Sequence, residues 1–189
     1  TAIVGGEYDN SEIGVAWIFT RSGTTWSQQG GKLVGSGYTG AYPHQGSSVS
    51  LSADGNTALV GGQNDNSGVG AVWIYTRSGS TWTQQGNKLV GSGYTGTPLH
   101  GISVSLSADG NTAIVGGTND NSNIGAAWIF ARNGSIWTQQ GSKLAGTGNI
   151  GASVQGISVS LSADGNTAIV GGFGDDSFKG AAWIYTRSG

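Results

Sequence analysis

The sequence predicts an all-β fold built from repeated antiparallel sheets of four strands each, and three observations predict it. The segment at residues 48–58 returns at 103–113 and again at 158–168, so the unit repeats every 55 residues. Each unit holds four short strand-like runs, which are joined by turns rich in Gly, Asn and Asp. No run has the apolar spacing, the caps or the length of a helix.

The first two runs of a unit predict a hairpin. Residues 103–107 alternate apolar and small polar side chains, which is the pattern of a half-buried strand. Asp109-Gly110 follows and favours a tight turn, because Gly takes a positive φ without strain. Residues 112–116 are nearly all apolar and predict a central strand that is covered on both faces.

The second half of a unit supplies two further strands. A polar loop at 118–125 precedes the third run, residues 126–131, and a short turn leads into the fourth run, residues 136–140. We expect Lys143-Leu144 to extend the fourth strand past a glycine bulge. Three Trp pairs are predicted to pack between successive sheets, with stacking on a ligand as the alternative: Trp17 with Trp26, Trp73 with Trp82, and Trp128 with Trp137.

A four-stranded unit that repeats at this length predicts a β-propeller with one blade per unit. The expected boundaries are a blade remnant at 1–40, blades at 41–96 and 97–151, and a partial blade at 152–189. These three and a half blades form an incomplete ring, because closure usually takes roughly 4–8. Both end pieces carry the second and third strands and cannot complete one shared blade. We therefore expect a longer chain or an assembly of several chains.

Composition excludes several classes of protein. Gly contributes 37 of the 189 residues without a collagen period, and the absence of Cys removes disulfides, thiolate nucleophiles and Cys-based zinc sites. A net charge of −2 with 8 Lys and Arg gives no basic surface for nucleic acid. No apolar run approaches the roughly 18 residues of a membrane helix, so membrane insertion is not expected. The chain begins at Thr1 rather than Met, from which we expect a mature or excised piece or one stretch of a longer repeat.

The repeated motifs resemble those of the FG-GAP family, the propeller repeats of integrin α-subunit heads and of many bacterial secreted proteins. The resemblance is carried by the core at residues 103–117, the Asp-Asn-Ser loop, Gly-Ala-Ala-Trp-Ile-Phe at 125–130 and Trp-Thr-Gln-Gln at 137–140. It covers essentially the whole chain. It implies adhesion, recognition or scaffolding, and seldom catalysis, at the level of the fold.

The sequence also departs from that family. The family's Phe-Gly stands here as Gln45-Gly46, His100-Gly101 and Gln155-Gly156. The calcium loop of the integrin type has shrunk to Ser-Ala-Asp-Gly-Asn-Thr, and one carboxylate in a tight turn cannot supply the six to eight oxygens that calcium takes. No calcium site is therefore carried over to the Asp of this turn, which is Asp54, Asp109 or Asp164.

An acidic turn recurs between the second and third strands and has two interpretations. Its Asp residues are Asp9, Asp65, Asp120 and the pair Asp175-Asp176. Asp and Asn commonly bond their own backbone in turns, which is the structural interpretation. The functional one is a weak calcium site, or a site for sugar hydroxyls, with these five residues as candidate ligands. No other cofactor is expected.

The loops between blades carry a second candidate site. Tyr38 is followed by His44, and Tyr94 is followed by His100, whereas the third copy has Ile150 and Gln155 instead. An aromatic ring beside a hydrogen-bonding group suits carbohydrate, and loops on a rigid scaffold are where binding usually occurs. The structural interpretation is ordinary loop packing.

No pattern points to catalysis. The two His lack triad partners, no Ser stands in Gly-x-Ser-x-Gly, and the carboxylates recur at blade spacing rather than in pairs. We therefore predict that the chain is not an enzyme. Asn133-Gly134-Ser135 matches the N-glycosylation pattern, so Asn133 is a candidate glycosylation site.

The predicted function is that of a non-catalytic structural or adhesive segment, located outside the cell or on its surface. Near-identical copies suit a role that depends on repetition, such as self-association with other copies or further blades in a ring, filament or longer chain. The alternative is a multivalent, lectin-like propeller that binds carbohydrate.

Overall fold

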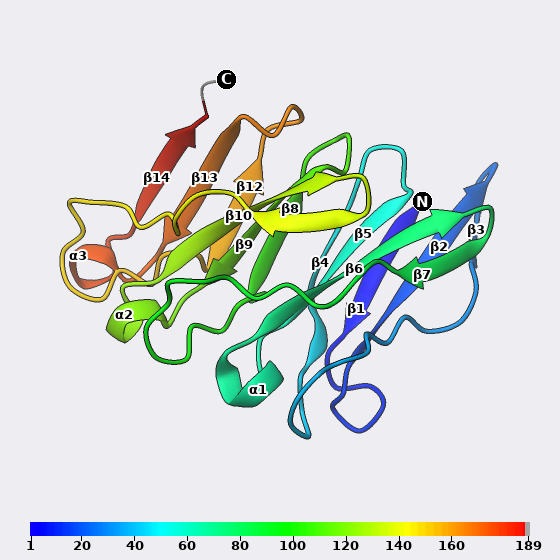
Figure 1. Cartoon of the computed structure of the whole chain (residues 1–189), viewed down its shortest axis with the longest axis horizontal. Helices are drawn as coiled ribbons and strands as arrows, with labels where there is room; N and C mark the ends of the chain where they lie inside the picture. Colours follow the sequence, from blue (N-terminus) through cyan, green and yellow to red (C-terminus); the bar gives the residue numbers. More distant parts are fainter. Residues whose placement is uncertain (188–189) are drawn as a thin grey trace.

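A computed structural model describes residues 1–187 as four antiparallel sheets arranged side by side in chain order (Figure 1). The first sheet consists of β1 (Ala2–Gly6), β2 (Val15–Ser22) and β3 (Thr25–Gln28). The second consists of β4 (Gln45–Leu51), β5 (Thr57–Gly62), β6 (Ala71–Ser78) and β7 (Thr81–Gln84). The third consists of β8 (Ser103–Leu106), β9 (Thr112–Gly117), β10 (Ala126–Asn133) and β11 (Ile136–Gln139). The fourth consists of β12 (Ser158–Leu161), β13 (Thr167–Gly172) and β14 (Ala181–Thr186).

The predicted all-β fold and the predicted strand runs are confirmed. Within each sheet, strands that are consecutive in the chain pair with one another. The four sheets contain three, four, four and three strands, which are the numbers that the repeats indicate. The expected extension of the fourth strand is present as an isolated antiparallel bridge between Ala127 and Leu144. The last two residues of the predicted partial blade lie outside the described residues.

The acidic turns differ from the predicted irregular loops, because three of them form a single helical turn. These are α1 (Asp65–Gly68), α2 (Asp120–Asn123) and α3 (Asp175–Phe178), which lie along one end of the sheets (Figure 1). Their backbone is largely left-handed: Asn66 has φ 50° and ψ 51°, and Ser67 has φ 56° and ψ 42°. Asn and Ser at these positions explain why no helical pattern is visible in the sequence, since a left-handed turn has no helical apolar spacing.

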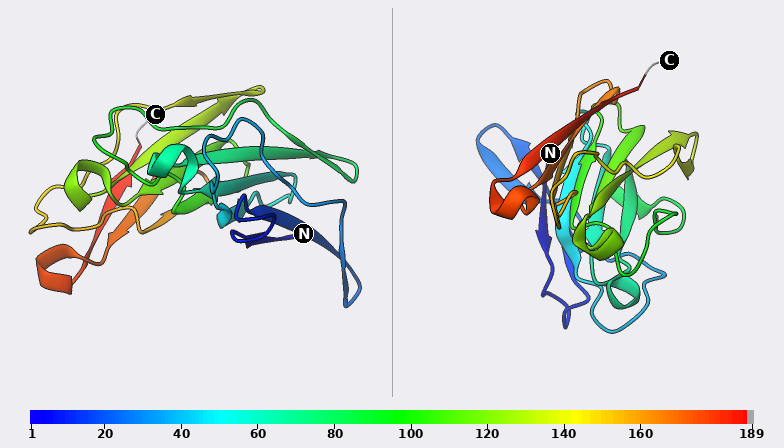
Figure 2. Two further views of the ribbon diagram at one scale, coloured as in Figure 1. Left: turned by 90° about the horizontal axis from the view of Figure 1, so that it is seen from below. Right: turned by 90° about the vertical axis from the view of Figure 1, so that its left-hand side faces the viewer.

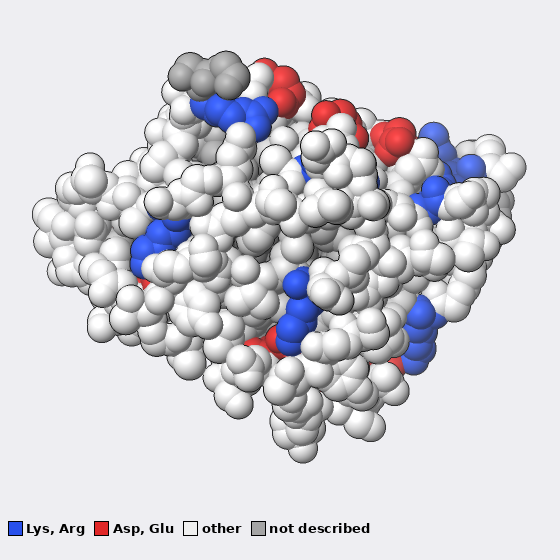
Figure 3. Space-filling model, in the orientation of Figure 1, with Lys and Arg blue, Asp and Glu red and all other residues white. Residues whose placement is uncertain are grey.

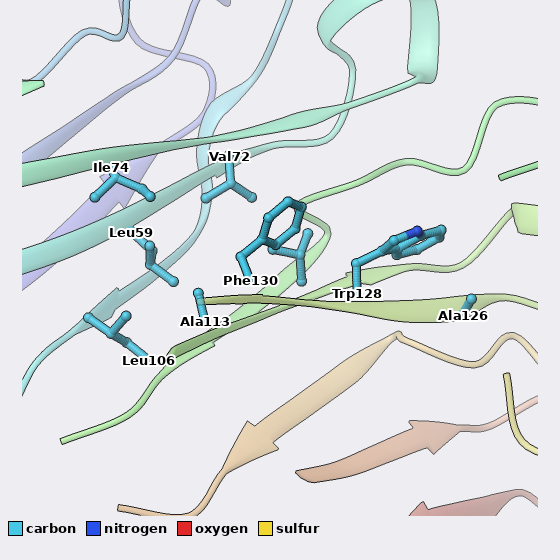
Figure 4. Close-up of a cluster of buried hydrophobic side chains, with 9 residues drawn as sticks. Leu59, Val72, Ile74, Leu106, Ala113, Ala126, Trp128 and Phe130 are labelled. Carbon is cyan, nitrogen blue, oxygen red and sulfur yellow. The ribbon is translucent and has the colours of Figure 1, made fainter. Parts of the chain in front are cut away.

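The hydrophobic core lies between the sheets. One cluster joins Leu59 of β5 and Ile74 of β6 to Trp128 and Phe130 of β10 (Figure 4). Equivalent clusters join the first sheet to the second and the third to the fourth. The predicted inter-blade packing of Trp is thus confirmed for Trp128, and Trp73 is likewise fully buried, so each sheet depends on its neighbour for its core.

Close packing against these Trp rings accounts for part of the high glycine content. A Cβ atom at Gly35 would lie 2.1 Å from Cδ1 of Trp73, and one at Gly91 would lie 2.4 Å from Cδ1 of Trp128. Gly at both positions is therefore required by the indole that packs on the backbone. The indole nitrogen of Trp73 completes the contact by donating to the carbonyl of Ser36 at 2.8 Å.

The first strands of successive four-stranded units, β4, β8 and β12, lie next to one another. Their serines join neighbouring sheets: Ser48 Oγ donates to the Gly101 carbonyl, and Ser103 Oγ donates to the Gly156 carbonyl, both at 2.7 Å. The four sheets form a curved array rather than a closed ring within residues 1–187 (Figure 2). Among the same residues, no helix has the length and the hydropathy needed to cross a membrane.

Candidate functional site

The recurrent acidic turn holds a buried carboxylate that fastens the loops between blades. Oδ1 of Asp65 accepts the backbone N–H of Thr39 at 2.7 Å, and Oδ2 accepts a hydrogen bond from the ammonium of Lys88. Thr39 lies in the loop that enters the blade, and Lys88 follows its last strand, β7. The carboxylate therefore joins the incoming and outgoing segments of one blade.

The same arrangement recurs in the neighbouring blades. Asp120 accepts the N–H of Thr95 at 2.7 Å and the ammonium of Lys143 at 2.5 Å. In the first sheet, Asp9 pairs with Lys32 at 2.5 Å. These bonds reach across loops, so the carboxylates do not bond their own turn as the structural interpretation expected.

These turns do not fit the predicted calcium site. The described residues contain no group of three or more His, Cys, Asp or Glu that could hold a metal ion. Asp65 and Asp120 already accept N–H and ammonium groups, and Asp176 points to Lys179 on the surface at 2.7 Å. One or two engaged carboxylates per turn cannot supply a calcium ion's oxygens.

The residue in place of the Phe-Gly phenylalanine is a buried anchor for the same loops. Gln45 is fully buried and makes two hydrogen bonds to Gly35: Oε1 accepts its N–H at 2.6 Å, and Nε2 donates to its carbonyl at 3.0 Å. Gln155 repeats this pair with Gly146 at 2.6 and 3.2 Å. The primary amide thus pairs with the backbone as another strand would.

His100 occupies the same position but makes neither of these bonds to the corresponding glycine, Gly91. It is fully buried between Tyr94 and Trp128, with ring centroids 5.3 and 4.2 Å away, and its Nδ1 donates to the Val69 carbonyl at 2.9 Å. Nε2 has no partner among the described residues. Burial lowers the pKa of His100 to about 4, against the smaller opposing effects of the Val69 carbonyl and the Asp120 charge.

The two predicted Tyr–His pairs are not equivalent in the structure, because their His residues occupy different positions. Gln45 forms a parallel bridge to Gly14, and His100 forms the equivalent bridge to Gly70. His100 therefore corresponds to Gln45, and His44 corresponds to Leu99. Equal spacing in sequence misleads here, because the first loop contains one extra residue. Full burial also leaves His100 no surface for a ligand.

The remaining members of the predicted sugar site differ in accessibility. Tyr38 and Tyr94 are each 37% exposed. His44 accepts a hydrogen bond at Nδ1 from the Asn64 amide at 3.0 Å, and its Nε2 lies 3.5 Å from the Glu12 carboxylate. Of the four residues predicted for this site, only the two tyrosines are substantially exposed to solvent.

A hollow that the sequence did not indicate lies beside α1. Its volume is about 410 Å³, and it is lined by Tyr42, Asn64, Ser67, Thr97 and Leu99 among others. Tyr42 is 56% exposed and lies in the loop with the extra residue. That length difference between copies is the signal that could have located the hollow.

A second repeated feature is an indole socket between neighbouring blades. Nε1 of Trp82, in β7, donates to Oε1 of Gln29 at 3.0 Å, and Arg77 donates to the same oxygen at 3.2 Å. The guanidinium of Arg77 also lies over the Trp82 ring, 5.5 Å from its centroid. Gln and Arg together therefore hold the Trp of the fourth strand.

The next junction repeats the socket with Trp137, Gln85 and Arg132. The Gln85 oxygen accepts the indole N–H at 2.9 Å and the guanidinium at 3.3 Å. At the last junction, Arg187 donates to Gln140 at 3.0 Å. No Trp from residues 1–187 enters this third socket, where a hollow of about 250 Å³ is lined by Gln140, Leu144, Ala168, Tyr185 and Arg187 among others.

The outer face of the last blade is apolar and uncovered within the described residues. Ile184 of β14 is 69% exposed, whereas its counterparts Ile18 and Ile74 are fully buried by the following blade. Ile169 of β13 is likewise exposed, whereas Ile114 in β9 is buried. At the other end of the array, Trp26 of β3 is half-exposed, so the predicted packing of this Trp between blades is absent.

Charge contributes little to the surface. Most of the face in Figure 3 is uncharged, with a few isolated basic and acidic side chains. Asn133 is exposed at the end of β10, beside the hairpin turn that contains Gly134 and Ser135, and its glycosylation stays a prediction.

Comparisons with known proteins give a fold but no family. No protein-family model and no curated protein matches the sequence. The periplasmic gluconolactonase of Pseudomonas aeruginosa aligns with 97% of this chain and 49% of its own, at 17% identity and a TM-score of 0.56. Hydrazine synthase of Kuenenia stuttgartiensis aligns with 76% of this chain and 33% of its own, at 16% identity and a TM-score of 0.41. The chain spans half or less of each of these two structures. The likeness to the gluconolactonase and the four antiparallel sheets show a β-propeller-like fold, as predicted.

The comparison with the gluconolactonase corrects one prediction. We predicted that the chain is not an enzyme, partly because the fold was expected to be seldom catalytic. A protein with this fold over 97% of the chain is an enzyme, so that prediction is overturned. At 17% identity the similarity shows the fold and assigns no reaction to this chain.

Proposed function

We propose that the chain is a repeat segment of an extracellular or envelope scaffold, in which a further blade covers the outer face of the fourth sheet. The observation that carries this proposal is the exposure of Ile184 at a position where the first two sheets have a fully buried Ile and the third has a partly buried one. Large apolar patches on a surface commonly mark interaction sites. The repeats indicate the partner, because every covered blade face in the array is covered by another blade.

Three further features support the scaffold. Within residues 1–187, each sheet shares core clusters with its neighbours alone, as in other repeat proteins. The low charge suits the wide contact surfaces of an assembly. A location outside the cytoplasm agrees with the periplasmic gluconolactonase of similar fold. The resemblance to the FG-GAP family rests on the sequence motifs alone.

Sedimentation velocity over a wide range of concentrations tests the proposal. We expect the chain to associate reversibly, and we expect Ile184→Asp to keep it monomeric, because a buried carboxylate would disfavour the contact. Ile136→Asp is the matched control, since Ile136 is 67% exposed but lies at the hairpin between β10 and β11. A monomer at every concentration, or association that survives Ile184→Asp, would contradict the proposal.

A second candidate function is carbohydrate binding, which the hollow beside α1 favours. It combines an exposed ring, Tyr42, with the amide of Asn64 and the hydroxyls of Ser67 and Thr97. Aromatic stacking with nearby hydrogen-bonding groups suits a sugar. Glycan-array binding that disappears in Tyr42→Ala would support this site, and binding lost only in Tyr38→Ala or Tyr94→Ala would favour the tyrosines predicted from sequence. A blank array with the wild-type chain would discard both.

A further inference from the structure

The fourth strand of each complete blade is held by four separate contacts. In the second blade, β7 pairs with β6 from Tyr75–Gln84 to Ser78–Thr81. Trp82 fills the indole socket of Gln29, and Lys88 reaches the buried Asp65. Leu89 then closes the segment by exchanging two backbone hydrogen bonds with Val72, at 2.8 and 3.0 Å.

The third blade repeats all four contacts. Strand β11 pairs with β10, and Trp137 enters the socket of Gln85. Lys143 reaches Asp120, and Leu144 pairs with Ala127 at 2.7 and 2.9 Å. Two independent copies therefore define what a fourth strand needs from the blade that receives it.

The last blade presents the receiving half of each contact. Within residues 1–187, β14 pairs only with β13, so its other edge is open. Gln140 is already oriented by Arg187 in the empty indole socket. Ala182 occupies the position of Val72, and its backbone has no strand partner on that side among the described residues.

The strongest single feature is the carboxylate of Asp175. The residue is 8% exposed, and its Oδ1 accepts the backbone N–H of Ile150 at 2.7 Å, as its counterparts accept the N–H groups of Thr39 and Thr95. In the described residues, no ammonium group reaches its Oδ2. A nearly buried carboxylate without a cation favours a partner that brings one.

We propose that this edge of the last blade binds, as an added β-strand, an extended segment of defined pattern. The segment carries Trp, then Lys and Leu six and seven residues later, as the chain's own fourth strands do from Trp82 and from Trp137. Trp enters the socket of Gln140, and Lys pairs with Asp175. Backbone hydrogen bonds to β14 supply affinity, and the two side chains supply specificity, as in other cases of strand addition.

The inference rests on the proposed scaffold function and names the partner of its open end. The two remain separable because they use different surfaces of the last blade. The scaffold proposal concerns the outer face around Ile184, whereas strand addition concerns the edge of β14 and the socket of Gln140.

Fluorescence anisotropy with a labelled peptide of residues 80–90 tests the inference on the full chain. We expect saturable binding, because this peptide contains Trp82, Lys88 and Leu89 at the required spacing. The peptide with Trp82→Ala and the peptide with Lys88→Glu should each bind at least about tenfold more weakly, which is the effect of one lost charged or buried hydrogen bond.

Variants of the chain locate the site. Gln140→Ala should weaken binding about tenfold without changing thermal stability, because the side chain is exposed and its socket is empty. Gln85→Ala is the matched control: its socket is filled by Trp137, so it should lower stability and leave peptide binding unchanged.

Two results would overturn the inference. One is the absence of saturable binding by the wild-type peptide. The other is equal binding by the wild-type and Trp82→Ala peptides, or binding that Gln85→Ala weakens as much as Gln140→Ala. If binding fails while sedimentation still shows association through Ile184, strand addition is wrong and the scaffold proposal stands.

Discussion

Strands β9 and β13 have the same sequence, Thr-Ala-Ile-Val-Gly-Gly, but not the same environment. All six residues of β9 are buried, whereas β13 alternates between exposed and buried positions along its first four residues. The face that is exposed in β13 is the face that the next blade covers in β9. The difference teaches that burial in this fold is set by the neighbouring blade rather than by the strand.

The tryptophans of the third strands show the same contrast. Trp128 of β10 is fully buried within a cluster shared by two blades, whereas Trp183 of β14 is only partly buried. Both indoles donate to a backbone carbonyl, at 2.8 Å to Ser92 and at 3.0 Å to Thr147. The hydrogen bond of the indole is therefore present in both blades, whereas burial of the ring depends on the neighbouring blade.

The largest expected effect comes from removing these two indoles. Trp128→Ala should lower the free energy of unfolding by about 3–5 kcal/mol, because it leaves a large cavity between two blades. Trp183→Ala should lower it by only about 1 kcal/mol, since part of that ring already faces water. Chemical denaturation followed by circular dichroism measures both. Equal losses would mean that the last blade is as well packed as the third.

The free energy of unfolding, measured as a function of pH, should reveal the buried His100, because the Gln residues at the equivalent positions do not titrate. The folded pKa of about 4 lies below the unfolded value of 6.5, so the unfolded chain binds the proton more readily. The contribution of the neutral His100 ring to the free energy of unfolding is complete above pH 6.5, and it is lost as the pH falls from 6.5 to 4. The loss should approach about 3 kcal/mol.

His100→Gln is the control for that titration and should flatten the slope between pH 6.5 and 4. Denaturant midpoints measured across this range give the comparison. An unchanged slope in the variant would assign the pH dependence to other groups.

The buried carboxylates give the next largest contrast. Asp120→Ala should destabilise the chain by about 2–3 kcal/mol, because it leaves the Thr95 N–H and the Lys143 ammonium without their acceptor. Asp175→Ala should cost about 1 kcal/mol, since within residues 1–187 it releases the Ile150 N–H alone. Thermal melts at low and high salt measure both losses. A larger loss at Asp175 would contradict the view that these carboxylates stabilise the fold by joining two segments of a blade.

The smallest expected effect is a gain in stability at neutral pH. His100→Gln should raise the free energy of unfolding by about 1 kcal/mol, because Gln can bond Gly91 twice as Gln45 bonds Gly35. Urea midpoints at neutral pH measure the change. A loss of stability would show that contacts of the imidazole with Tyr94 and Trp128 outweigh the missing bonds.

The sequence predicted the strands well, because alternation and Asp-Gly turns act locally. It could not predict the left-handed turn at Asn66, whose residues also suit an ordinary loop. It also paired His44 with His100, since a one-residue difference in loop length is invisible in a spacing count. The bonds of Asp65 to Thr39 and Lys88 join segments that only the fold brings together, so the turn suggested calcium instead.

Hydrogen exchange of β14 compared with β10 tests the central claim most directly, namely that the last blade carries an open half of the junction seen between inner blades. At low protein concentration, the amides of β14 should exchange much faster than those of β10, which pairs on both edges. Protection of β14 should rise toward that of β10 as concentration rises or as the peptide of residues 80–90 is added. Slow exchange of β14 in the dilute chain would contradict the account. Fast exchange that changes neither with protein concentration nor with the peptide would contradict it as well.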